Sequence, residues 1–167
     1  MPDALIRRNV LGTCSVVVVR RTLFARVGGF RTSLSGAEDL EMWWRAAVLG
    51  ARFAYTTEAL AERHKEVDSI TADARAFAPR RLMALAACEE TARQAGRVDL
   101  LPLLRQAHAD TWHDLLKTCA RAGRRADTLR AFRERIRYGM SGESVRHLAM
   151  GMMGPRITDL ARRVLRR

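Results

Sequence analysis

The pattern of apolar positions in the first part of the chain predicts strands. Residues 14–19 are mostly apolar and β-branched with no polar alternation, which is typical of a strand covered on both faces in a parallel or mixed sheet. Residues 52–57 and 60–65 have the composition of two further short strands. A strand such as the one predicted over residues 14–19 needs packed layers on both faces and neighbouring strands on both edges.

A helical period appears between these predicted strands. Residues 21–27 form a short amphipathic segment that ends at Gly28–Gly29, where glycine adopts a positive φ at little cost. A helix is predicted over residues 40–49, because apolar side chains recur at i, i+3, i+4, i+7 and i+8 and Gly50 follows. The front of the chain therefore resembles the second half of an α/β domain, with an incomplete sheet.

The rest of the chain has a helical pattern throughout. Residues 79–95 predict a helix that begins at Pro79, and Asp99 is placed to cap a longer helix that ends at Gly123. A further helix is predicted over residues 125–138. Two short arginine-rich helices follow, each with apolar side chains at i, i+3 and i+7: Val145, Leu148 and Met152, then Ile157, Leu160 and Val164.

The charge changes at the same place as the pattern. Residues 1–78 carry a net charge of +2 and residues 79–167 carry +10, within a total of +12 over 167 residues. We therefore predict two domains, an α/β unit over residues 1–78 and a basic α-helical extension over residues 79–167. No apolar run approaches the roughly 20 residues that span a bilayer, and a cytoplasmic location is expected.

An ordered series of motif residues runs through the front unit, within residues 5–75. Its members are Asn9, Val19–Arg20–Arg21, Phe24, Val27–Gly28–Gly29–Phe30, Glu38–Asp39, Trp43, Arg45, Gly50, Arg63–His64 and Ser69. This series resembles glycosyltransferase family 2. The resemblance implies the GT-A fold, a mixed sheet of which this chain would hold the C-terminal, acceptor-side half. It also implies inverting transfer of a sugar from a nucleotide-sugar donor to a hydroxyl of a cell-envelope glycan or lipid.

The resemblance also implies roles for single residues. Asp39 takes the position of the catalytic base with Glu38 as its acidic partner, and the alternative is that Asp39 only caps the helix after it. Trp43 falls on the apolar stripe of that helix, so core packing is the alternative to contact with a sugar. The implied substrate-binding residues are Gly28, Gly29, Trp43 and Arg63.

The metal site implied by the resemblance is incomplete in this chain. His64 corresponds to the family histidine that can complete a site for Mn²⁺ or Mg²⁺, but the Asp-x-Asp motif that supplies the other ligands occurs nowhere in the sequence. We expect a divalent metal in the full-length enzyme, none bound by this chain alone, and a missing N-terminal donor-binding half. His108, His113 and His147 are not expected to form a metal site.

The basic rear unit leaves two alternatives open. Its last two helices could lie on an anionic membrane surface, at the inner face of the cell membrane, or could pack onto the domain. The alternative function for the whole chain is a basic helical nucleic-acid-binding or scaffold module. No nucleic-acid-binding motif is present, and specific nucleic-acid binding is not expected.

Overall fold

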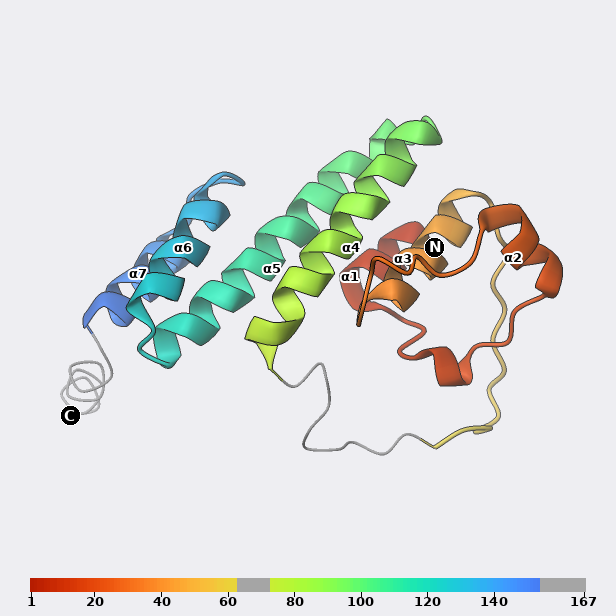
Figure 1. Ribbon diagram of the computed structural model, residues 1–167, viewed down its shortest axis with the longest axis horizontal. Helices are drawn as coiled ribbons and strands as arrows, with labels where there is room; N and C mark the ends of the chain where they lie inside the picture. Colours follow the sequence, from red (N-terminus) through yellow and green to blue (C-terminus); the bar gives the residue numbers. More distant parts are fainter. Residues whose placement is uncertain (63–72, 154–167) are drawn as a thin grey trace.

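The described part of the molecule is entirely helical. A computed structural model describes residues 1–62 and 73–153 (Figure 1). No residue in these ranges lies in a β-strand, so the prediction of an α/β fold with a partial GT-A mixed sheet is wrong. In chain order the elements are α1 (Pro2–Arg8), the 3₁₀ turn η1 (Cys14–Val16), α2 (Arg21–Val27), α3 (Glu38–Val48), α4 (Ala74–Gln94), the 3₁₀ turn η2 (Val98–Leu100), α5 (Leu101–Arg121), α6 (Arg125–Ile136) and α7 (Gly142–Met153).

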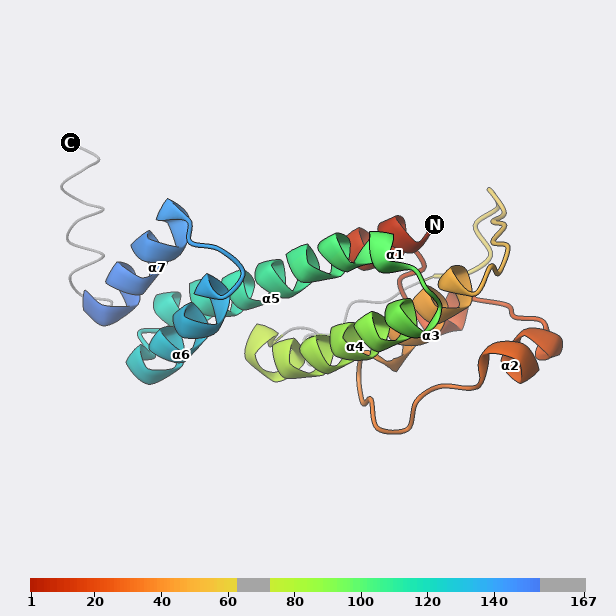
Figure 2. The same ribbon diagram turned by 90° about the horizontal axis from the view of Figure 1, so that it is seen from above.

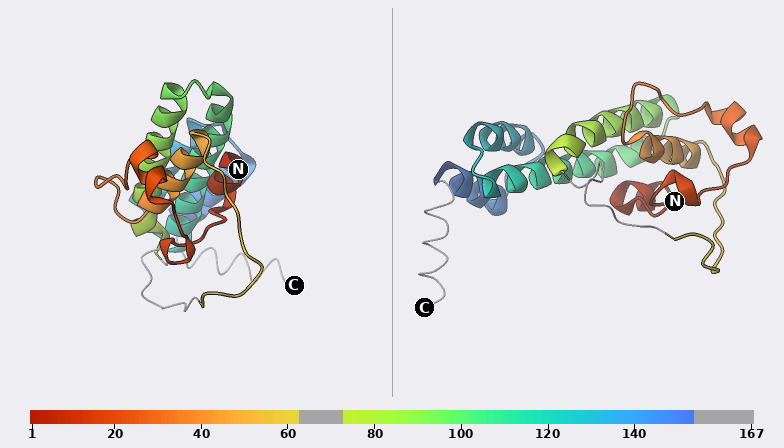
Figure 3. Two further views of the ribbon diagram at one scale, coloured as in Figure 1. Left: turned by 90° about the vertical axis from the view of Figure 1, so that its right-hand side faces the viewer. Right: turned by 60° about the horizontal axis from the view of Figure 1, so that its bottom comes forward.

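The helices are arranged along a central hairpin. α4 and α5 lie side by side, joined by the short η2 turn, and run through the middle of an elongated molecule (Figure 1). α1, α2 and α3 gather at one end of this hairpin, and α6 and α7 pack against the other end of α5 (Figures 2 and 3). The long α5 helix therefore connects two packing centres.

The segment predicted as a buried strand is extended only in part. Cys14–Val16 form η1, and the backbone is extended at Val17. The side chains of Val17 and Val19 pack partly against the core, whereas Val18 is fully exposed. β-branched residues favour extended backbone, but a strand also needs a neighbour that bonds its N–H and C=O groups, and none of the described segments does so.

The other two predicted strands also fail. Residues 52–57 and the described part of the second segment, residues 60–62, have no regular structure, and residues 63–65 lie outside the described residues. Their exposure explains the difference, because Tyr55 and Leu60 are largely in solvent and bury no face. Pairing of such short segments is marginal without a packed face.

The two helices predicted in the front of the chain are confirmed. α2 ends at Gly28, whose φ of 79° only glycine adopts without strain. α3 begins two residues before the predicted range and ends at Leu49, and its stripe is buried as expected. Trp44 is completely buried at the centre of the main core, where α3 meets α1, α4 and α5. Its companions in this core include Leu5, Ile6, Met42, Leu85, Cys88 and Leu104.

α6 begins at Arg125 as predicted, whereas the starts of α4 and α5 differ from the prediction. Asp73 caps α4, accepting a hydrogen bond from the N–H of Arg75 (2.9 Å), so the helix starts at Ala74 and not at Pro79. Pro79 lies inside α4, where it removes one backbone hydrogen bond. Asp99 pairs with Arg97 (2.8 Å) and does not cap α5. The division into two domains at this point stays a prediction.

The face that α7 buries is not the predicted apolar stripe. Ser144, His147 and Gly151 are buried, whereas Val145 and Met152 are exposed. A Cβ at Gly151 would lie 2.6 Å from Cγ2 of Thr128 on α6 and 3.1 Å from Cα of Ala120 on α5. Small residues therefore allow α7 to approach α5 and α6 closely, and the apolar stripe is left outside.

This close approach gives a direct prediction for stability. We expect Gly151→Leu to lower the free energy of unfolding by about 1–3 kcal/mol, because the added side chain must displace Thr128. Gly142→Ala, on the same helix but with nothing near its Cβ, is expected to change it by less than about 0.5 kcal/mol. Urea unfolding followed by circular dichroism measures both. Equal stability of the two variants would show that α7 does not pack as described.

No helix among the described residues has the length and apolar character needed to cross a membrane. The contact of the C-terminal helices with an anionic membrane surface stays a prediction, since residues 154–167 lie outside the described residues.

Candidate functional site

Two half-buried carboxylates open α3. The helix begins after Ala37, which caps it without a side-chain hydrogen bond, so Asp39 is the second helical residue and not the cap itself. Asp39 Oδ1 accepts a hydrogen bond from the N–H of Leu40 (2.6 Å), and Glu38 Oε2 accepts one from the N–H of Gly36 (2.5 Å). A carboxylate has two oxygens, so each side chain keeps further acceptor capacity at the N-terminus of the helix.

The thiol of Cys14 lies near this acidic pair. The pKa of Cys14 is raised, first by the loss of part of its hydration and then by the negative charges of Asp39 and Glu38. The thiol is therefore held in its protonated form, which is the less nucleophilic form. The carboxylates are the groups at this end of α3 that can accept a proton.

An arginine in the last turn of α3 fixes the loop that follows α2. Arg45 forms a bidentate pair with Glu41 on the same helix, at 2.9 Å from Nε to Oε1 and 3.0 Å from Nη2 to Oε2. Its guanidinium also donates to the carbonyl oxygens at the end of α2, those of Val27, Gly28 (3.3 Å) and Gly29 (2.8 Å). The two predicted loop glycines are therefore held by a buried charge on α3.

The remaining predicted site residues are placed differently. Trp43 is only 3% exposed and stacks edge-on with Phe30 in the core, as the packing alternative predicts. A sugar therefore reaches its indole ring only if the loop moves, and its role in binding stays a prediction. Arg63 and His64 lie outside the described residues.

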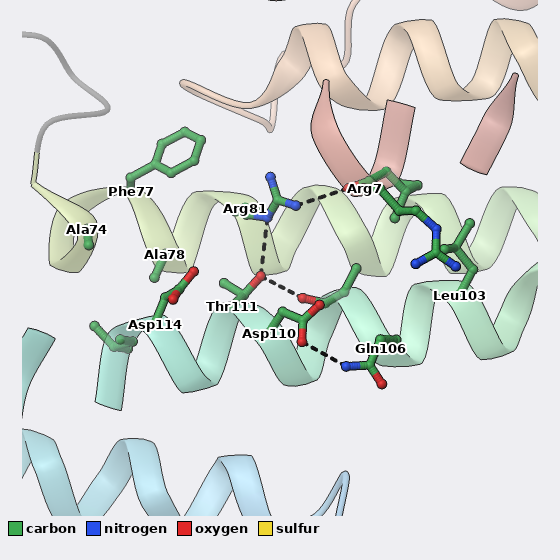
Figure 4. Close-up of a pocket in the computed structure, with 13 residues that line it drawn as sticks. Arg7, Ala74, Phe77, Ala78, Arg81, Leu103, Gln106, Asp110, Thr111 and Asp114 are labelled. Carbon is green, nitrogen blue, oxygen red and sulfur yellow. Dashed lines mark hydrogen bonds between the residues drawn. The ribbon is translucent and has the colours of Figure 1, made fainter. Parts of the chain in front are cut away.

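A cavity of about 460 Å³ lies between α1, α4 and α5 (Figure 4). Its lining contains the aromatic ring of Phe77, the carboxylates of Asp110 and Asp114, and the guanidinium of Arg81. Arg81 donates to Thr111 Oγ1 (3.2 Å) and to a carbonyl of α1, so it is fixed in place (Figure 4). Burial lowers the pKa of Arg81 from its usual value.

One residue connects this cavity with the segment before α3, although no residue of α3 itself lines the cavity. Phe77 lines the cavity and also packs against a small cluster that contains Leu34 and Ala37. Ala37 directly precedes Glu38. Aromatic and carboxylate groups around a cavity of this volume suit a small polyhydroxylated ligand, because the ring covers its apolar face and the polar groups bond its hydroxyls.

A second group of ionisable side chains joins α5 to α7. Nε2 of His113 lies 3.6 Å from Oε2 of Glu143, and Nε2 of His147 lies 3.7 Å from Oε1 of the same carboxylate. Burial lowers the pKa of His147, and the positive charges of Arg146 and His113 add to this effect. No metal site was expected at these histidines, but the packing of α7 on α5 brings His113 and His147 together around Glu143.

The remaining histidine of the rear unit, His108, lies in the packed interior. His108 is buried, stacks on Tyr138 with ring centroids 5.8 Å apart, and lies 3.5 Å from Glu89. Burial lowers its pKa. It is a satisfied core histidine and belongs to no cluster of metal-ligating side chains in the part of the chain that is described.

Sequence reasoning missed the histidine pair because its members come from different helices. One local signal was present, the Glu143-x-x-x-His147 spacing, which places both side chains on one face of a helix. The partner His113 is 30 positions earlier, and no local pattern connects it to α7.

Comparison with known proteins gives no relative. The resemblance to glycosyltransferase family 2 is not supported, because the mixed sheet that the family's fold requires is absent from residues 1–62 and 73–153. The chain matches no protein-family model, no curated protein and no solved structure.

Proposed function

We propose that the chain supplies the acceptor-activating carboxylate of a sugar-transfer reaction, with Asp39 as the base. The observation that carries the proposal is the half-buried acidic pair at the start of α3. It is supported by a cavity that suits a polyhydroxylated ligand and whose lining residue Phe77 also packs against Ala37, the residue before the pair. The proposal rests on this arrangement and does not require a sheet, which residues 1–62 and 73–153 do not contain.

On the acceptor side, the transfer step needs few groups of the protein besides this acidic pair. As the acceptor oxygen bonds to the anomeric carbon of the donor sugar, its proton passes to the carboxylate of Asp39. The bond from that carbon to the phosphate oxygen breaks, and the nucleoside diphosphate leaves with the electron pair. Glu38 lies beside Asp39 as its acidic partner, and Arg45 holds the Gly28–Gly29 loop against the last turn of the same helix.

Donor binding is assigned to a second polypeptide or segment. No Asp-x-Asp motif occurs in the sequence to hold a metal–diphosphate group. The extended residues around Val18 offer an exposed, unpaired backbone edge close to Cys14 and the acidic pair. Such an edge is suited to pairing with a strand of another chain.

The experiment is complementation of a cell extract. An extract from source cells lacking the gene is supplied with radiolabelled nucleotide sugars, and the purified chain is added back. We expect the chain to restore incorporation of label into a glycan or glycolipid, and to transfer no label without the extract. Incorporation that is independent of the gene and of the added chain would contradict a role in sugar transfer.

A further inference from the structure

The cluster formed by His113, Glu143 and His147 has the composition of a metal site. Each residue offers one ligand atom, and these atoms all lie within 4.8 Å of one another. Two imidazoles and one carboxylate form the three-residue ligand set of many zinc sites, in which a water molecule completes the tetrahedron. The same set can also bind other divalent transition metals.

The burial of His147 is the independent sign that a ligand is missing from its surroundings. Its side chain is only 4% exposed, and neither Nδ1 nor Nε2 has a hydrogen-bond partner among the described residues. A buried imidazole that makes no hydrogen bond is costly, because it loses its hydration without compensation. A metal ion on one of its nitrogens supplies the missing interaction.

The distances between the ligand atoms of the three side chains are close to those around a bound zinc ion. Ligand bonds of about 2.0–2.2 Å in a tetrahedral zinc site place ligand atoms about 3.3–3.5 Å apart. The two imidazole nitrogens already lie 3.6 and 3.7 Å from the carboxylate oxygens of Glu143. Small rotations of the side chains are sufficient, because Glu143 is 57% exposed and its carboxylate is otherwise paired only with the exposed Arg146 on the same helix, at 3.3 Å.

A neighbouring hydroxyl orients one of the ligands. Oγ of Ser144, which is fully buried, lies 3.5 Å from Nδ1 of His113. An Nδ1–H that donates to this oxygen leaves Nε2 unprotonated on the side of Glu143, as metal binding requires. Ser144 Oγ also lies 2.9 Å from Ser141 Oγ, so its position is fixed in turn.

We propose that His113, Glu143 and His147 form a Zn²⁺-binding site that joins α5 to α7. The buried His147 and the half-buried His113 hold the ion from the inside, and the exposed carboxylate of Glu143 closes the site on the solvent side. The fourth position faces solvent next to Glu143 and is open to water. The site is independent of the sugar-transfer proposal and lies in the other packing centre of the molecule (Figure 2).

The test is a titration of the purified, metal-free chain with Zn²⁺ by isothermal calorimetry, repeated with Co²⁺ to read the ligand field by absorption. We expect one equivalent of Zn²⁺ to bind. We also expect ligand-field bands of a four-coordinate Co²⁺ site without a thiolate charge-transfer band. At Zn²⁺ concentrations about 100-fold above Kd, the Tm should rise by roughly 5–10 °C.

Substitutions separate this site from adventitious binding. Glu143→Gln and His113→Gln are expected to weaken Zn²⁺ binding by at least about tenfold, while the Tm of the metal-free protein changes little. Glu90→Gln is the matched control, since its carboxylate is 59% exposed and lies on α4. Absence of stoichiometric binding, or equal affinity in Glu143→Gln and the wild-type chain, would overturn the proposal.

Discussion

Replacing Arg45 with methionine is expected to lower the free energy of unfolding by about 3–5 kcal/mol, because it leaves the Glu41 carboxylate buried without its main partner. The side chain of Glu41 is 0% exposed and that of Arg45 only 10%. Arg31, 3.1 Å from the same carboxylate but 34% exposed, is the one cation that remains beside it among the described residues. The variant also frees the carbonyl groups of Val27, Gly28 and Gly29 that Arg45 holds.

The chain offers a closely matched control for this variant. Arg93 on α4 pairs with Glu89 at the same i, i+4 spacing and at 3.2 Å, but its side chain is 60% exposed. Arg93→Met removes an equivalent pair that is exposed to solvent. It is expected to lower the free energy of unfolding by less than about 1 kcal/mol. Urea unfolding of both variants measures the difference. Similar costs for Arg45→Met and Arg93→Met would show that the Glu41 pair is not buried in solution.

A double variant isolates the charge from the packing. In Glu41→Gln with Arg45→Met, no buried carboxylate is left uncompensated, so the combined loss should be smaller than the sum of the two single losses. Full additivity would contradict the bidentate contact between these side chains. Arg45 also links α3 to the end of α2, and the position of the Gly28–Gly29 loop depends on this link.

The sequence predicts the helices of this chain better than its overall architecture, for a physical reason. A helix satisfies its own hydrogen bonds, so the apolar period and the following glycine were sufficient to predict α2 and α3. A strand depends on a partner elsewhere. The composition of residues 14–19 favoured extended backbone, but it contained no information on whether a neighbouring strand is present.

The buried polar contacts were the least predictable part. The pairing of Arg45 with Glu41 follows the local i, i+4 spacing, whereas the approach of Arg31 to the same carboxylate depends on the packed loop. The buried face of α7 was missed because small residues at Ser144 and Gly151 permit close helix contact that an apolar period does not detect. The cluster of His113, Glu143 and His147 was missed for the same reason, because His147 lies on this buried face.

The role of Asp39 predicts the largest effect on activity. In the complementation assay, Asp39→Asn keeps the size of the side chain but can no longer accept the proton of the acceptor hydroxyl. We expect the rate of label incorporation to fall by about 10²–10⁴-fold, the contribution typical of a positioned base. The Tm should change little, because Asp39 is half-buried and is not the helix cap.

The matched control for this measurement is Asp127→Asn. Asp127 is also an acidic residue in the first turn of a helix, α6, so the variant reproduces the lost interaction with the helix dipole at a distance from α3. The most direct test of the account is therefore the rate of sugar incorporation restored by Asp39→Asn relative to that restored by Asp127→Asn. We predict a rate at least about 100-fold lower for Asp39→Asn. Equal rates, with both proteins folded, would contradict the assignment of the α3 carboxylate as the base.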